Sequence, residues 1–373
     1  MAGLYIHIPF CKSRCIYCGF YSTVEESTIP LYVDALCREM ELRPSPYIFN
    51  TVYFGGGTPS RLPIPFLKQI FNKIQSLYTV SDDAEITLEC NPDDITEDFA
   101  QSLSELPVNR ISMGAQTFDN QRLAFLRRRH TAGQVKTAVA RLRHAGIHNI
   151  SIDLIYGFPQ ETMQEWDQDI RQVLQMDVEH ISAYCLSIEE GTALHQLTMQ
   201  GKVQPADEEA CLAMYYHLID QLKDADYTHY EISNFAKPGY HSRHNSSYWD
   251  GTPYWGIGAA AHSYDIQTRH WNVADLHTYI QQLKEGTLPV EEREVIDMPT
   301  RYNDYVMTSL RTQHGIDLHY IHQQFPQQYS DYLQQQAERH LQCHLLEKDD
   351  HHLRLTKEAL FISDSIISDL FYA

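Results

Sequence analysis

The chain has 373 residues, 43% of them hydrophobic, and its 29 basic and 49 acidic side chains give a formal net charge of −20. This length is sufficient for one large domain and a smaller one, each with a hydrophobic core. The acidic balance argues against a general nucleic-acid binder, and no apolar run approaches the roughly 18–20 residues of a membrane span.

Short β-type runs alternate with helical patterns through the first part of the chain. The expected strands are Leu4–Ile8, Thr51–Phe54, Glu85–Glu89, Arg110–Met113, Ile150–Ile155 and His180–Leu186. The helical patterns that follow them are Ile29–Leu42, Pro65–Leu77, Thr96–Leu103, segments ending at Ala145, Met163–Gln175 and Asp207–Lys223. Six strand-then-helix units predict an α/β fold with a parallel sheet. We expect a parallel-strand partial (β/α)6 barrel of the TIM type, with a doubly wound open sheet as the alternative.

The pattern changes after the sixth unit. Residues 228–265 are rich in Gly, Tyr, Trp, His and Asn. A surface loop rarely carries so many aromatic residues, so this segment is expected to pack over a site. We expect a first domain over residues 1–285, with an aromatic-rich extension at about 228–285.

The rest of the chain predicts a small helical domain over residues 290–373. Glu291–Arg311 has the pattern of a helix, and Lys348–Asp350 marks the turn of a short β-hairpin. Glu358–Phe371 predicts a closing amphipathic helix. Helices with one hairpin resemble a winged-helix module. Because this module has no basic face, packing or protein interaction is expected rather than DNA binding.

The cysteines are distributed unevenly. The N-terminus has neither a secretory signal nor a transit peptide, so we expect a cytoplasmic, bacterial protein. In that compartment, eight cysteines do not indicate a disulfide framework. Cys11, Cys15 and Cys18 lie within eight residues, whereas the other five are scattered and are expected to be small buried residues.

The spacing C-x3-C-x2-C predicts a [4Fe–4S] cluster. Three thiolates on one tight loop can hold three irons of a cubane and leave the fourth open for a substrate. Zinc is the main alternative, but structural zinc needs four closed ligands, usually in paired C-x2-C units, and a second pair is missing. His7 or a distant residue could supply a fourth ligand. Three buried free cysteines are the remaining alternative.

Ligand-like residues follow successive strands of the expected barrel. Gly56, Gly57 and Thr58 follow the second strand in a glycine turn, which lets a ligand approach the backbone. Glu89 ends the third strand, and Gln116 follows the fourth. Each could instead be a cap or an ion-pair partner, but together they form a binding mouth at one edge of the sheet.

Asp153 is a further member of this mouth. It lies inside the fifth strand between Ile152 and Leu154. A carboxylate there is costly unless it is paired or bound to a ligand.

The cysteine loop after a first strand resembles the radical S-adenosylmethionine superfamily. In more detail, YIHIPFC, GGGTPS, Ser112–Gln116 and Ser151–Pro159 resemble oxygen-independent coproporphyrinogen III oxidase and its haem-chaperone relatives over essentially the whole chain. The resemblance implies that an open iron binds S-adenosylmethionine and that electron transfer releases a deoxyadenosyl radical.

The resemblance also implies a role for each residue of the mouth. Tyr5 should lie against the cofactor. Gly56, Gly57 and Thr58 should contact its methionine part, and Glu89 its ammonium group. Arg128, one of three adjacent arginines, should pair with the carboxylate. Gln116 and Asp153 should take the ribose hydroxyls.

Three features resemble the haem-chaperone subfamily rather than the oxidase. Phe20 stands where the oxidase has a fourth cysteine, and the N-terminal extension of the oxidase is missing. His244, Tyr248 and Trp249 fit an H-N-x-x-Y-W pattern that the resemblance ties to haem binding. Imidazole is a common axial ligand of haem, and aromatic rings pack against the macrocycle. Among 20 histidines, His241 and His262 remain alternatives.

We therefore expect a haem carrier that passes its cargo to an apo-haem protein, such as a respiratory enzyme at the membrane, and that needs an electron donor for its cluster. Cleavage of S-adenosylmethionine is expected, and no nucleic acid is expected to bind. The alternative is anaerobic oxidative decarboxylation of coproporphyrinogen III. A third reading is a radical enzyme with another substrate, including RNA, although the negative charge disfavours RNA.

Overall fold

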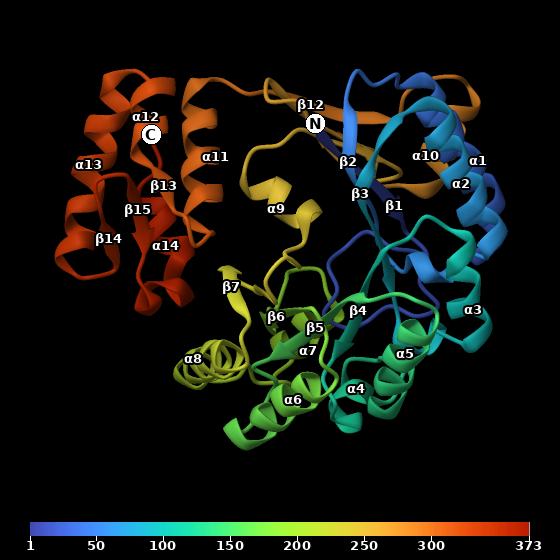
Figure 1. The fold of residues 1–373 in the computed structure, drawn as a ribbon, viewed down its shortest axis with the longest axis horizontal. Coiled ribbons are helices and arrows are strands. Elements are labelled where there is room, and N and C mark those ends of the chain that lie inside the picture. The colour runs from blue at the N-terminus through green and yellow to red at the C-terminus, as the bar shows by residue number, and fades with distance from the viewer. Residues whose placement is uncertain (373) are drawn as a thin grey trace.

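The computed structural model describes residues 1–372, and a twelve-stranded sheet with the order β12-β11-β10-β9-β1-β2-β3-β4-β5-β6-β8-β7 runs through its first part (Figure 1). Six parallel strands form the middle of this sheet: β1 (Ala2–Ile8), β2 (Ile48–Gly56), β3 (Thr79–Cys90), β4 (Arg110–Gln116), β5 (Asn149–Tyr156) and β6 (His180–Cys185). They pair in chain order, which confirms the partial (β/α)6 barrel. A doubly wound sheet is excluded, because its strand order reverses at a switch point.

Helices cover the outer face of these strands (Figure 1). They are α1 (Ile29–Leu42), α2 (Ile64–Leu77), α3 (Glu97–Ser102), α4 (Asn120–Phe125), α5 (Ala132–His144), α6 (Met163–Gln175), α7 (Ala193–Met199) and α8 (Glu208–Asp224). The bounds of α1 and α6 agree with the sequence prediction, whereas α7 was not foreseen. No helix among residues 1–372 is long and apolar enough to cross a membrane.

Alternate residues of the six strands have different surroundings. One set joins the core beneath the helices; it includes Leu4, Ile6, Ile8, Val52, Phe54, Leu88, Ile111, Met113, Ile152, Leu154 and Ile181. Successive side chains of a strand point to opposite faces, so the other set faces the barrel interior. That set is mostly polar: Tyr5, His7, Thr51, Tyr53, Thr87, Glu89, Arg110, Ser112, Ser151, Asp153, His180, Ser182 and Tyr184. We call the space between these side chains the lumen.

Further strands extend both edges of the barrel. β9 (Tyr254–Ile257), β10 (His262–Tyr264), β11 (Thr268–Asn272) and β12 (Val290–Val295) continue from β1, and α10 (Leu276–Lys284) packs on α1. β8 (Asn234–Ala236) and β7 (Thr228–Glu231) continue from β6. Because β6 pairs with β8 and not with β1, the barrel does not close.

The short helix α9 (Arg243–Trp249) lies at the N-terminal ends of the barrel strands. The Glu85 carboxylate accepts the backbone N–H groups of Arg243 and His244, both at 3.0 Å. A carboxylate at a helix N-terminus satisfies free N–H groups and complements the helix dipole. Helix α9, one part of the aromatic-rich segment, therefore covers the end of the barrel opposite the cysteine loop.

The C-terminal unit has its own hydrophobic core, from Tyr302 to Leu370. Its elements are α11 (Met298–Leu310), β13 (Ile316–Asp317), α12 (Leu318–Gln324), α13 (Gln327–Gln342), β14 (Leu346–Lys348), β15 (His352–Leu355) and α14 (Ser363–Asp369). This order, with the hairpin near the end, is that of a winged-helix module. It lies beside the barrel, and its α11 faces α9 (Figure 1).

Two expectations for this region need correction. Residues 290–295 form β12, which pairs with β11, so the helix expected from Glu291 begins at Met298 and the second unit begins after Val295. The closing helix is shorter than expected, because residues 357–362 form a 3-10 turn before α14.

Candidate functional site

The three cysteines lie on one closed loop that leaves the C-terminal end of β1. The neck of the loop is fixed by two backbone hydrogen bonds, from Cys11 N to Thr23 O at 2.8 Å and from Thr23 N to Pro9 O at 2.7 Å. Its far side is held by hydrogen bonds from Ile16 N to Leu126 O at 3.2 Å and from Leu194 N to Ile16 O at 2.8 Å. The loop is thus anchored to two other parts of the barrel mouth.

All three thiols are free and partly exposed. Cys11 Sγ lies 3.5 Å from Thr58 Oγ1, and Arg128 Nη1 donates to Cys15 Sγ at 3.5 Å. Burial raises the pKa of the Cys11 and Cys18 thiols. Binding of iron would overcome this burial effect, because a coordinated thiol is deprotonated.

The donor set fits a cubane better than a single ion. Among residues 1–372, no group of three or more His, Cys, Asp or Glu side chains converges on one point where a metal ion would sit. A [4Fe–4S] cluster does not need such convergence, because each cysteine binds its own iron. Structural zinc would need a fourth ligand close to the same point.

The glycine turn after β2 lies directly against the cysteine loop. Gly57 N donates to Ile8 O at 2.8 Å, and a Cβ at Gly57 would lie 2.7 Å from the Pro9 carbonyl carbon. Gly56 has a φ of 111° and lies against the His7 ring, so a side chain fits there neither in conformation nor in space. The two glycines therefore let the turn pack closely against the end of β1 and the start of the cysteine loop.

Glu89 and Asp153 face the lumen below the mouth. Tyr53 OH donates to Glu89 Oε1 at 2.6 Å, and Ser112 Oγ donates to Asp153 Oδ1 at 3.5 Å. Burial raises the pKa of Glu89 to about 7 and that of Asp153 to about 6.

These carboxyls remain partly accessible although they lie deep in the molecule, and Tyr184 nearby is 44% exposed while burial raises its pKa. Deep but accessible side chains indicate a hollow interior.

The structure distinguishes the three adjacent arginines. Arg127 is exposed, and Arg129 pairs with Asp93 at 2.9 Å. Arg128 points toward the cysteine loop. Its Nη2 donates to Asn91 Oδ1 and to Gly114 O, both at 2.6 Å, and its buried Nε has no partner. Arg128 therefore keeps its Nε–H for a ligand at the mouth.

Gln116 ends β4 with a φ of 68°. A Cβ at Gly114 would lie 2.6 Å from the Gln116 amide nitrogen and 3.2 Å from Arg128 Nη2. A larger residue at position 114 would therefore have to displace the ends of these two side chains. Gln116 thus lies beside Arg128 at the same edge of the sheet.

Tyr5 lies inside the lumen and belongs to an aromatic stack. Its hydroxyl lies 3.0 Å from His7 Nδ1, and its ring stacks with Tyr53 at a centroid distance of 6.2 Å. Tyr53, Asn91 and Arg110 were not singled out from the sequence. The alternation of apolar and polar residues along each strand is the signal that would have identified Tyr53 and Arg110.

The H-N-x-x-Y-W residues lie at the other end of the lumen, on α9. His244 is buried and stacks on Tyr53 at a centroid distance of 4.9 Å. Its Nδ1 lies 2.8 Å from Thr51 Oγ1, and its Nε2 lies 3.0 Å from Tyr248 OH. Burial, then the charge of Arg110, lowers the pKa of His244 to about 3. Both ring nitrogens are therefore engaged, and the ring is neutral.

Trp249 and the two alternative histidines lie farther out. Arg311 lies over the Trp249 ring at 5.7 Å, and Trp249 Nε1 is buried without a partner. His241 stacks on Tyr230 at 4.3 Å, and exposed His262 stacks on Trp271 at 5.4 Å.

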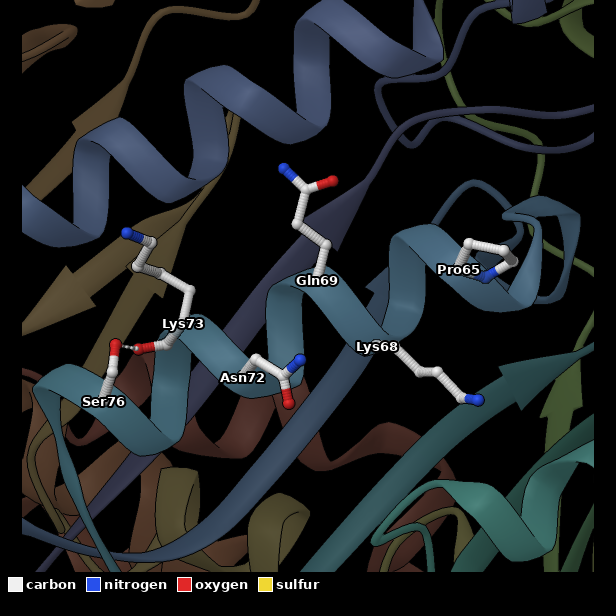
Figure 2. A pocket seen from close by; sticks show the side chains of 6 residues that line it. All are labelled: Pro65, Lys68, Gln69, Asn72, Lys73 and Ser76. Atoms are coloured by element: carbon white, nitrogen blue, oxygen red, sulfur yellow. Dashed lines mark hydrogen bonds between the residues drawn. The ribbon is translucent and has the colours of Figure 1, made fainter.

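A shallow hollow on the outer face of α2 is separate from this site (Figure 2). Its lining residues are Pro65, Lys68, Gln69, Asn72, Lys73 and Ser76. Lys68 pairs with Glu105, and Lys73 with Glu41 at 2.8 Å. With its cations already paired, this surface has no feature that indicates a ligand.

The sequence is similar to known proteins over almost its full length. Residues 5–173 match the Radical SAM superfamily, and residues 296–362 match the HemN C-terminal domain. "Heme chaperone HemW" of Lactococcus lactis is 32% identical over 366 residues, which cover 97% of this chain and 95% of the relative. The protein of that name in Bacillus subtilis is 34% identical over 321 residues, 85% of each chain.

A solved structure shows the same fold. The radical SAM enzyme coproporphyrinogen III oxidase (HemN) of Escherichia coli superposes with a TM-score of 0.87 over 99% of this chain and 89% of its own. The two sequences are 22% identical.

Proposed function

Since the chain belongs to the radical SAM superfamily and, within it, to the family of the heme chaperones HemW, we propose that it binds haem and passes it to apo-haem proteins. The similarity to these chaperones over 97% of the chain carries the proposal. Phe20 supports it, because this 72% exposed side chain stands where the oxidase resemblance requires a fourth cysteine. We expect the exchange in the cytoplasm, with an acceptor such as a membrane-associated respiratory enzyme and with an electron donor, but without nucleic acid.

In this proposal Cys11, Cys15 and Cys18 hold a [4Fe–4S] cluster, and S-adenosylmethionine binds beside it. When bound, the two groups supply one-electron cleavage of a sulfonium. The protein binds and orients the cofactor at the mouth. Glu89 faces the ammonium group, and the free Nε of Arg128 suits a carboxylate.

The remaining mouth residues complete the proposed cofactor site. Gln116 at the end of β4 and Asp153 in β5 are the residues proposed to bind the ribose hydroxyls. The bare backbone of Gly56 and Gly57, with Thr58, takes the methionine part. Tyr5 lies below, as a wall of the site.

His244, with Tyr248 and Trp249, is the proposed haem site. A neutral imidazole is the form that binds iron. In the structure the hydroxyl of Tyr248 occupies the Nε2 side of His244, so ligation requires Tyr248 to turn away. Tyr248→Phe removes this hydrogen bond and should favour the ligand-competent state.

A haemin titration of the anaerobically reconstituted protein, followed in the Soret region, tests the proposal. We expect saturable binding that weakens at least tenfold in His244→Ala and does not weaken in Tyr248→Phe. His241→Ala and His262→Ala are the matched controls. Weakening in one of these controls alone would move the ligand to that residue.

A wild-type protein that shows no specific haem binding would contradict the carrier function. Turnover of coproporphyrinogen III to a vinyl product, with S-adenosylmethionine under reduction, would then establish the oxidase.

A further inference from the structure

Arg110 is a buried cation with two nitrogens that have no hydrogen-bonding partner among the described residues. It opens β4 and is 1% exposed. Its Nε and Nη1 are buried and donate no hydrogen bond to any of residues 1–372. The charge of Arg110 acts on Glu89 and Asp153 in the same lumen, where it opposes the larger effect of burial and lowers the pKa of each carboxyl. The buried Nε and Nη1 nevertheless have no acceptor, and buried donors without an acceptor are unfavourable.

The side chain of Arg110 points into the lumen. Ile111 and Met113 belong to the core beneath the helices, so Arg110 and Ser112 face the interior. Arg110 precedes Ser112 by two residues and therefore lies about 7 Å deeper, toward the covered end of the barrel. Its charge contributes to the lowered pKa of His180 and His244, second to burial in each case.

The polar groups around Arg110 are already used by other partners. Tyr53 OH donates to Glu89 at 2.6 Å. The two nitrogens of His180 lie 2.8 Å from Ser151 Oγ and 2.7 Å from Tyr230 OH. Those of His244 lie beside Thr51 and Tyr248, as described above. Each of these groups is thus held by a partner other than the guanidinium.

The residues on either side of Arg110 are also unpaired. Thr87 on β3 and Asn149 on β5 are its register partners in the sheet. Thr87 Oγ1 and Asn149 Oδ1 are both buried without a hydrogen-bonding partner. An asparagine amide can turn to present its NH2 group. One row across three strands therefore offers a guanidinium, a hydroxyl and an amide to the lumen.

We propose that Arg110, with Thr87 and Asn149, is the receptor for a carboxylate group of a ligand inside the lumen. A guanidinium binds a carboxylate through two parallel N–H···O bonds, which would satisfy Nε and one terminal nitrogen. A singly charged group fits better than a phosphate, because the carboxyls of Glu89 and Asp153 lie in the same lumen. Resting on the proposed function, we assign the carboxylate to a propionate of haem.

The first test compares the stabilities of two buried arginines. Arg43 is also buried, but it donates to Asn272 Oδ1 at 2.7 Å and lies 3.2 Å from Glu39 Oε1. We expect Arg110→Met to unfold at an equal or higher urea concentration than the wild type, because it removes a buried guanidinium whose Nε and Nη1 have no acceptor. Arg43→Met should unfold at a clearly lower concentration. An equal loss in both variants would show that Arg110 is structural and would overturn the proposal.

The second test uses ligands with and without the carboxylate. Reconstituted wild-type protein and Arg110→Met are titrated with haemin and with haemin dimethyl ester. We expect the wild type to bind haemin at least tenfold more tightly than the ester, and Arg110→Met to bind the two equally. An unchanged preference for haemin in Arg110→Met would overturn the proposal.

The third test separates the cargo from the cofactor, which also carries a carboxylate. S-adenosylmethionine and its decarboxylated analogue are titrated into the same two proteins. Loss of the preference for the carboxylate form in Arg110→Met would overturn the assignment to haem and give the receptor to the cofactor. If the wild type binds neither haemin nor the ester, the proposed function fails. The stability comparison and the titrations with S-adenosylmethionine and its decarboxylated analogue then still show whether Arg110 binds a carboxylate.

Discussion

Glu89 combines deep burial with one hydrogen bond from Tyr53, and burial raises its pKa to about 7. Below that pH the carboxyl is neutral, and above it the carboxylate is formed. An ammonium group is attracted to the charged form. We expect the affinity for S-adenosylmethionine to rise between pH 6 and 8, and to change by up to about tenfold per unit below pH 7.

Calorimetric titration of the reconstituted protein at several pH values measures this dependence. Glu89→Gln is the control, and its affinity should be weaker and nearly independent of pH. A wild-type affinity that is constant from pH 6 to 8 would show that Glu89 does not face the ammonium group.

Single residues differ in how far the sequence could identify them. The cysteines, the glycine turn and Glu89 follow strand ends, so their shared edge could be inferred before the structure. The choice of Arg128 among three arginines depends on where each side chain points, which follows from contacts with Asn91 and Asp93. The contact of His244 with Tyr248 is a local i, i+4 pair within α9. The contacts of His244 with Thr51 and Tyr53 depend on the docking of α9, which no local pattern specifies. Its role in haem binding stays a prediction.

The glycine turn shows how one element supports another. Gly57 lies against the backbone of Pro9, just before Cys11, and a Cβ there would meet the Pro9 carbonyl group at 2.7–2.8 Å. Backbone cannot move aside as a flexible side chain can. Gly57→Ala should lower the free energy of unfolding by about 1–3 kcal/mol through overpacking. It should also reduce the iron content after reconstitution.

Urea unfolding and iron analysis of purified Gly57→Ala measure both effects. Gly133→Ala, at the start of α5, is the matched control, because nothing lies within 4 Å of its Cβ position. It should be neutral or more stable by about 0.4–1 kcal/mol. Equal behaviour of the two variants would mean that the turn does not position the cysteine loop.

At the level of elements, strands with one apolar face were predicted well. Apolar residues at every second position, followed by a segment with helical periodicity, are a local signal of a strand and its helix. The helices α1 and α6 have clear helical periodicity. β12 was misassigned because Val-Glu-Glu-Arg-Glu-Val is rich in good helix formers and has no buried face. Its pairing with β11 across the sheet decides its structure, and a distant partner outweighs local propensity.

For the whole molecule, the buried titratable groups fall into two opposing sets. Burial lowers the pKa values of four histidines to about 3 or 4: His7, His130, His244 and His270. Burial raises those of four carboxyls to about 6 or 7: Glu89, Asp153, Glu161 and Asp169. In the first set the unfolded state binds more protons below pH 6.5, so stability rises with pH. In the second set the native state binds more protons above about pH 4, so stability falls as pH rises.

Between about pH 4.5 and 6, the rise in stability with pH from the histidines and the fall from the carboxyls offset each other. We therefore expect a nearly constant free energy of unfolding in this range and a fall below about pH 4, where the histidine effect remains. Asp169→Asn removes one opposing carboxyl, so its free energy of unfolding should rise with pH between 4.5 and 6. Urea unfolding at several pH values compares the two proteins, and a variant whose stability falls with pH in that range would reverse the assigned sign.

The order of the twelve strands could be predicted only in part. Six strand–helix units indicate a parallel sheet, but the edge strands come from segments without alternation. Contacts such as the hydrogen bond from Gln313 N to Tyr230 O at 3.1 Å, which joins the C-terminal unit to β7, link residues far apart in the chain. Such contacts depend on the assembled shape and leave no local trace.

The alternation along β1 to β6 also limits how such a sequence can change over time. Replacing one lumen residue alters the chemistry of the interior and leaves the apolar row beneath the helices intact. Inserting or deleting one residue in a strand would exchange the two rows beyond that point, sending charges under the helices and apolar groups into the hollow. Point substitutions in the lumen can therefore adapt this barrel to new ligands, whereas insertions and deletions are tolerated only in the loops between strands.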